Sequence, residues 1–275
     1  MILTDENYYS PESNQEYFST SQFKAFDKCP AAAMAELRGE WERPKSEALL
    51  VGSYIDERLT GTVASFNAFM DKHRAEIINS RTGELKAAFL AAEDTVQRVM
   101  QQPLMRKHLG GQHQVIMTGQ IEGVPFKIKM DSFHPGRMIV DLKYMKSLRS
   151  PNTYQPMIQY WGYDKQGAIY QEIVRQNTGE RLPFFLNVAT KENPARLAIG
   201  EITQPNLDMA LDYVKAHIVG YQTIKCGDRE PVRCEAYDCD YCAETNVITQ
   251  PMDSDYFGYS AAQIEQANLY RREGY

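Results

Sequence analysis

The chain has 275 residues, with 30 basic and 36 acidic side chains and a net charge of −6. No apolar run approaches the ~18 residues that a membrane span needs, and no basic stretch followed by an apolar one opens the chain, so we expect a cytoplasmic protein of one large domain. The negative charge does not favour nucleic-acid binding, although a local basic channel matters more than the total.

The first 110 residues are predicted to be mainly helical. One helix is expected over residues 19–37, with the Cys29-Pro30 step inside it, and a second starts at Ser46. Residues 63–109 read as one or two further helices.

The pattern then changes to that of strands. Residues 113–120 and 124–131 flank a tight turn, and residues 137–144 form a further strand. In the second strand apolar residues alternate with Lys127, Lys129 and Asp131. One face is therefore apolar, and the two lysines on the other are expected to contact phosphate or water.

The remainder predicts two helices, two strands and a polar tail. The helices cover residues 155–178 and 206–225, and strand 183–191 pairs with 195–203. A short helix-like segment ends the chain at 260–275.

This order of elements predicts an α/β fold with a mixed sheet. We expect a single domain over residues 1–275. Within it, residues 1–110 form a mainly helical N-terminal part, and residues 111–205 form the catalytic sheet with a helix. Residues 206–275 form a C-terminal helix, the cysteine cluster and a tail.

Two acids and a lysine lie close together on the expected strands. Asp141 and Lys143 are two residues apart, so they project from the same face of a strand, and a hairpin can bring Asp131 beside them. Two carboxylates and an ammonium suit a divalent metal and a phosphodiester.

Together with four other landmarks, these residues give the chain a resemblance to the PD-(D/E)XK nuclease superfamily, and within it to the RecB-like and RecE-type (exodeoxyribonuclease VIII-like) phage exonucleases. The resemblance implies a restriction-endonuclease-like core with a mixed central sheet flanked by helices, plus N-terminal helical elements. The landmarks, in chain order, are Cys29-Pro30, Gly52-x-x-x-Asp56, Asp131, Asp141-Leu142-Lys143 and Gln166-x-x-x-Tyr170.

The resemblance also implies roles. Asp131, Asp141 and the carbonyl of Leu142 would bind Mg²⁺ or Mn²⁺, with Asp56 where the family usually has histidine. Lys143 would position or deprotonate the attacking water, or offset charge in the transition state.

Gln166 and Tyr170 would face the site and hold its acids or the DNA strand. Alternatives remain for each of these roles. Asp56 could be a solvated acid, Gln166 and Tyr170 could merely pack, and Gln159 and Tyr163 fit the same spacing.

The cysteines form a second group. Cys234, Cys239 and Cys242 follow the pattern C-x(4)-C-x(2)-C, whereas Cys226 is the least suited to be a ligand. The resemblance implies that these three and Cys29 hold a [4Fe–4S] cluster; zinc or free thiols are the alternatives.

These expectations describe a Mg²⁺-dependent exonuclease that degrades one strand of linear duplex DNA from its end. The 5′ to 3′ direction is implied by the resemblance only. The sequence has no G-x-x-x-x-G-K-[ST] motif, so ATP-driven unwinding is not expected. The resemblance implies a single-strand annealing (RecT-like) recombinase as partner, and a homo-oligomer. An endonuclease and a non-cutting DNA-binding or partner-binding module are the alternatives.

Overall fold

The computed structural model describes residues 1–44, 46–151, 154–234, 239–247 and 251. The chain divides into two compact units. Unit 1 comprises Met1–Thr20 and Lys45–Val219, and unit 2 comprises Ser21–Pro44 and Gly220–Tyr275. The helix expected at 260–275 lies outside the described residues.

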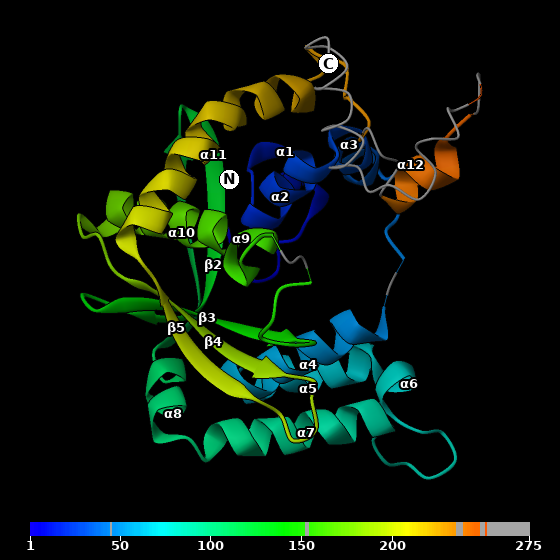
Figure 1. The fold of residues 1–275 in the computed structure, drawn as a ribbon. Helices are drawn as coiled ribbons and strands as arrows, with labels where there is room; N and C mark the ends of the chain where they lie inside the picture. Colours follow the sequence, from blue (N-terminus) through cyan, green and yellow to red (C-terminus); the bar gives the residue numbers. More distant parts are fainter. Residues whose placement is uncertain (45, 152–153, 235–238, 248–250, 252–275) are drawn as a thin grey trace. The chain divides into compact units, whose positions relative to one another are not determined.

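Unit 1 is built on a five-stranded mixed sheet (Figure 1). Its strands lie in the order of the sequence, all neighbours are antiparallel except β3 and β4, and the turn between β1 and β2 falls at Glu122 and Gly123. The predicted mixed sheet and its first hairpin are confirmed. The strands are β1 (Gln112–Ile121), β2 (Val124–His134), β3 (Met138–Met145), β4 (Phe184–Thr190) and β5 (Leu197–Ile202).

Helices cover both faces of this sheet. Because side chains alternate along a strand, Val140 and Leu142 of β3 pack against a helical core that contains Ile55 and Phe89. The helices on this side are α4 (Glu47–Thr60), α5 (Val63–Lys72), α6 (Arg74–Ile77), α7 (Ala87–Met100) and α8 (Pro103–Leu109). None of the described helices is long and apolar enough to cross a membrane.

The prediction of one or two helices over residues 63–109 was wrong, because four lie there. Turn residues explain the breaks: Gly83 adopts φ 74°, and Pro103 occupies the first turn of α8.

The prediction of a single helix over residues 19–37 is also wrong. This segment forms two helices, α2 (Thr20–Lys28) and α3 (Pro30–Arg38), with Cys29 between them in an extended conformation at φ −160° and ψ 99°. A residue before proline is disfavoured in helical geometry, so Pro30 ends one helix and begins the next.

The helix expected over 155–178 divides in the same way, into α9 (Met157–Tyr160) and α10 (Tyr163–Thr178). Gly162 lies between them at φ 62°, a left-handed conformation that favours glycine. As a result Gln159 and Tyr163 belong to different helices, whereas Gln166 and Tyr170 share one helix and lie one turn apart.

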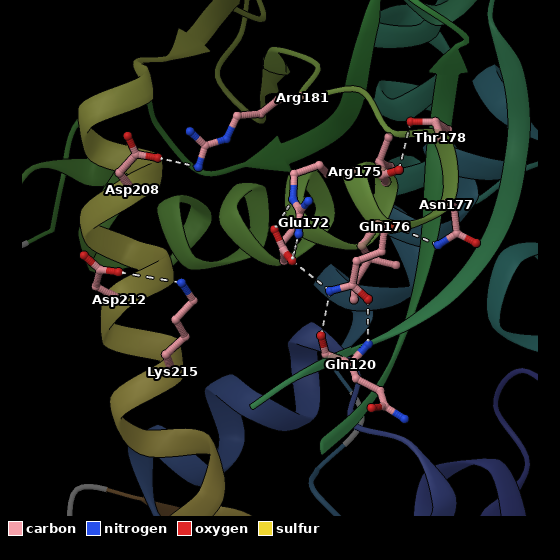
Figure 2. A network of polar contacts seen from close by, with 12 residues as sticks. Gln120, Glu172, Arg175, Gln176, Asn177, Thr178, Arg181, Asp208, Asp212 and Lys215 are labelled. Atoms are coloured by element: carbon pink, nitrogen blue, oxygen red, sulfur yellow. Dashed lines mark hydrogen bonds and ion pairs between the residues drawn. The ribbon is translucent and has the colours of Figure 1, made fainter. Parts of the chain in front are cut away.

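Helix α10 is fixed to the sheet at its C-terminal end (Figure 2). The Gln176 amide donates to the carbonyl of Gln120 at 2.7 Å and accepts from its N–H at 2.9 Å, and Asn177 donates to the carbonyl of Thr118 at 2.9 Å. β1 is an edge strand, so these side chains satisfy backbone groups that lack a neighbouring strand.

Close packing fixes the middle of α10. A Cβ on Gly167 would lie 2.8 Å from the side chains of both Phe184, on β4, and Leu207, on α11 (Gln204–Lys225). Only glycine allows this close approach of α10 to β4 and α11.

Lys127 does not lie on a solvated or phosphate-binding face, contrary to expectation. It is 1% exposed, and its ammonium donates to Ser13 and Asn14 at 2.7 Å each and to the carbonyl of Tyr8. Ser13 and Asn14 lie in α1 (Pro11–Glu16), so Lys127 ties the N-terminal segment to β2.

Replacing Lys127 by methionine should therefore lower the free energy of unfolding by about 2–3 kcal/mol, since buried acceptors of a charged donor lose their partner. Denaturant unfolding of Lys127→Met beside Lys107→Met, an exposed lysine on α8, measures the difference. Equal stability of the two variants would show that the buried ammonium contributes nothing.

Candidate active site

The site begins where β2 and β3 separate. Their ladder pairs Ser132 with Val140 and continues away from the site. Before it, the Asp131 carboxylate replaces the backbone partner, and its Oδ2 accepts the N–H of Leu142 at 2.7 Å. One carboxylate is thereby held at the fork between the strands.

Asp141 and Lys143 lie side by side on β3, as their spacing predicts. The Lys143 ammonium forms an ion pair with Asp141 Oδ2, donates to the Leu142 carbonyl at 3.4 Å and lies 5.6 Å from the centre of the Tyr163 ring. The Asp141 side chain is only 3% exposed, whereas that of Lys143 is 22% exposed. The lysine can therefore be reached from solvent while the acid lies beneath it.

Helix α10 supplies the next contact. Gln166 Nε2 donates to Asp141 Oδ1 at 2.6 Å, so the two Asp141 oxygens have an amide and an ammonium as neighbours. Tyr170 instead donates to the carbonyl of Lys129 on β2 at 2.9 Å. Gln166 thus contacts a site acid directly, whereas Tyr170 contacts the strand that carries Asp131.

Asp56 reaches the site from α4. Thr60, one turn later, donates from its hydroxyl to Asp56 Oδ1 at 2.9 Å, and Gln114 of β1 donates to that hydroxyl at 2.9 Å. Gln114 has φ 52°, which is uncommon for a residue with a side chain and costs on the order of 1 kcal/mol.

The sequence reasoning missed Thr60 and Gln114. The i, i+4 spacing of Asp56 and Thr60 on a helix could have revealed the first. Nothing local identifies Gln114, because its role depends on tertiary contact.

Mutual repulsion shows that the acids share one environment. Burial raises the pKa of Asp131 well above its usual range, and the charges of Asp56 and Asp141 raise it further. Burial likewise raises the pKa of Asp56, helped by Asp141. Burial lowers the pKa of Lys143, but the carboxylates of Asp141 and Asp131 outweigh it and leave the pKa raised.

Three carboxylates facing one ammonium form a site short of positive charge. Carboxylate and backbone carbonyl oxygens are the ligands that Mg²⁺ and Mn²⁺ prefer. The donors of Asp56, Asp131 and Asp141, with the carbonyl of Leu142, therefore fit a divalent cation in both type and charge.

Gly52 lies one turn before Asp56 on α4. Apart from its two chain neighbours and the backbone of α4 itself, no atom of the described residues lies within 4 Å of the position that a Cβ would occupy there. Packing inside the protein thus does not require glycine, although glycine destabilises a helix interior by about 1 kcal/mol.

Unit 2 holds the four cysteines that the sequence groups together. The sulfur atoms of Cys29, Cys234, Cys239 and Cys242 all lie within 4.8 Å of one another, and Cys29 and Cys242 are buried. Cys226 is exposed and belongs to no such group among the described residues. The arrangement is compatible with a metal site.

Comparisons with known proteins agree with this geometry. Residues 19–245 match the family described as "PDDEXK-like domain of unknown function (DUF3799)". The chain is 43% identical to a protein from Eubacterium rectale whose crystal structure is described as that of a "Putative exonuclease"; the match covers 94% of this chain and 100% of that one, with a TM-score of 0.86. No curated protein matches.

Proposed function

This chain belongs to the PDDEXK-like domain family and the PD-(D/E)XK nuclease superfamily, and from that premise we propose that it is a Mg²⁺-dependent, ATP-independent deoxyribonuclease that degrades linear duplex DNA from its ends. One observation carries the proposal: Asp131, Asp141 and Lys143 converge at the fork between β2 and β3, with Gln166 on Asp141. Two carboxylates and a cation on adjacent strands support a site for a divalent ion and a phosphate.

The acids and the Leu142 carbonyl would hold the ion. When bound, a divalent ion supplies a Lewis acid for the scissile phosphate and a water of lowered pKa. Asp131 is oriented for this by the Leu142 N–H and Asp141 by Gln166, so neither carboxylate needs to reorganise.

Lys143 supplies the remaining positive charge. Its ion pair with Asp141 fixes the ammonium above the buried acid on the more exposed side of the site. We propose that it contacts the phosphate and offsets the negative charge that develops on it. The open space beside Gly52 would let the DNA backbone approach α4 one turn from Asp56.

Gln166 should act by orienting Asp141. Replacing it by methionine, which keeps its length but cannot donate, should raise the Mg²⁺ concentration needed for half-maximal cleavage by about 10–100-fold. Gln171→Met is the matched control, because Gln171 is buried on the same helix and donates to Leu182 and Gln204 instead. Equal Mg²⁺ dependence of the two variants would contradict the role of Gln166.

Substrate form separates an exonuclease from an endonuclease. Incubation with Mg²⁺ should degrade linear duplex DNA and leave covalently closed circles intact. Nicking or linearisation of the circles would establish endonuclease action instead.

Further features rest on the resemblance to RecE-type exonucleases. They are 5′ to 3′ polarity, a ring-shaped homo-oligomer that encloses the duplex, and a single-strand annealing recombinase that loads on the exposed strand. End-labelled duplexes would test the polarity, and sedimentation with and without that recombinase would test the partners.

Asp56 favours a second candidate, a module of the same fold that binds DNA without cutting, because the family usually has histidine there. Carboxylate remains a good ligand for Mg²⁺, so we prefer the enzyme. Binding of duplex DNA without cleavage, in either Mg²⁺ or Mn²⁺, would support the module.

A further inference from the structure

The distances between the four cysteine sulfur atoms in unit 2 distinguish a single metal ion from an iron–sulfur cluster. Cys29 Sγ lies 3.6 Å from Cys242 Sγ, and Cys234 Sγ lies 3.5 Å from Cys239 Sγ. No pair of the four sulfur atoms is more than 4.8 Å apart. These separations are far longer than the 2.05 Å or so of a disulfide bond.

The separations do not fit the [4Fe–4S] cluster that the resemblance implies. In such a cube an iron atom stands between the centre and each thiolate, which spaces the cysteine sulfurs about 6 Å apart. A single tetrahedral ion with metal–sulfur bonds of about 2.3 Å spaces them about 3.8 Å apart. The Cys29–Cys242 and Cys234–Cys239 separations are near the value for a single tetrahedral ion. Even the widest separation is below the value for a [4Fe–4S] cluster.

We propose that Cys29, Cys234, Cys239 and Cys242 bind one tetrahedral zinc ion. Four cysteine ligands complete the coordination of zinc and leave no open position, which is the arrangement of a structural site. Two backbone donors already point at the sulfurs: the N–H of Ala32 donates to Cys29 at 3.5 Å, and that of Cys242 to Cys239 at 3.4 Å. Such donors offset the negative charge of four thiolates on one divalent ion.

The ion would join two segments of unit 2 that are far apart in sequence. Around it, the N–H of Ala31 donates to the carbonyl of Val232 at 3.1 Å, and the Trp41 indole donates to Glu244 at 2.8 Å. Trp41 and Tyr241 also pack edge to face, with ring centres 5.8 Å apart. Zinc would therefore fix α3 to the segment around α12 (Asp240–Thr245) and stabilise unit 2 without entering the chemistry of the acids.

Elemental analysis of the full-length protein tests the proposal. Purification should be carried out both in air and without oxygen, from medium that contains iron and zinc, so that a cluster lost to oxidation is not mistaken for zinc. We expect one zinc per chain and no iron or acid-labile sulfide in both preparations. Cobalt exchanged into the site should give the visible d–d absorption of tetrahedral thiolate coordination.

Iron with acid-labile sulfide in the anaerobic preparation would overturn the proposal in favour of a cluster. Metal-free protein in which all five thiols titrate, or in which disulfides have formed, would overturn it in favour of no site. Cys242→Ser should lose the zinc, whereas Cys226→Ser, at an exposed position outside the group, should keep it. If Cys242→Ser does not fold, removal and return of zinc in the unmodified protein, followed by thermal unfolding, gives the same answer: stability should fall and recover.

Discussion

Replacing Asp141 by asparagine should reduce Mg²⁺-dependent cleavage of linear duplex DNA by at least about 10³-fold, because the central carboxylate of the metal site is lost. Asparagine has the same shape, and Gln166 can still donate to its amide oxygen. The fold should therefore survive while the charge that attracts the ion and holds Lys143 disappears.

Metal-dependent stability separates this effect from misfolding. At a metal concentration 100 times the dissociation constant, a specifically bound ion stabilises the folded state by about 2.7 kcal/mol. The unmodified protein should show this gain with Mn²⁺, and Asp141→Asn should not. Asp71→Asn changes an exposed acid on α5 and should behave like the unmodified protein. Cleavage by Asp141→Asn at the rate of the unmodified protein would show that Asp141 is not an active-site residue.

Replacing Lys143 by methionine should, unlike Asp141→Asn, reduce cleavage without weakening metal binding. Cleavage should fall by about 10²–10³-fold, since a fixed cation is lost from the place where charge develops. Metal binding should persist or strengthen, because in the unmodified protein the Lys143 ammonium competes with the metal for the Asp141 carboxylate, and methionine does not.

A thermal shift with Mn²⁺ and a single-turnover cleavage assay, made on the same preparation, measure the two effects. Lys143→Arg restores the charge with a different geometry and should recover part of the rate. If Lys143→Met lost the Mn²⁺ shift as well, the lysine would be acting through the metal site. If it cleaved at the normal rate, the proposed role of Lys143 would be wrong.

The relative positions of the site residues on β2 and β3 could be predicted from the sequence, because they depend only on residues close together in the chain. The two-residue period fixes Asp141 and Lys143 on one face, and the hairpin between β2 and β3, which turns at Pro135 and Gly136, sets the register that carries Asp131 to the fork. The i, i+4 spacing on one helix likewise places Gln166 and Tyr170 together.

Breaks within helices and buried polar contacts could not be predicted as well. Gly162 and Pro30 both interrupt periodic patterns that look continuous, and only the backbone angles show where each helix stops. Lys127 alternates with apolar residues as a solvated lysine would, yet the N-terminal segment folds over it. That contact joins residues more than 110 positions apart, and no local pattern encodes it.

The link from Gln114 through Thr60 to Asp56 has the same origin. It combines a helix turn, which the sequence contains, with a left-handed strand residue, which it does not. The grouping of Cys29 with the three C-terminal cysteines was suggested by the resemblance, but the spacing of their sulfur atoms needed coordinates.

The most direct test of the central claim is a crystal of the protein soaked in Mn²⁺, with anomalous diffraction recorded to locate the ion. We expect a peak bound by Asp131, Asp141 and the Leu142 carbonyl, with metal–oxygen distances near the ~2.1 Å typical of a hard divalent ion. Asp141→Asn should show no such peak at this position. Absence of manganese from this position at saturating concentration, or binding elsewhere only, would contradict a metal-dependent active site at the fork between β2 and β3.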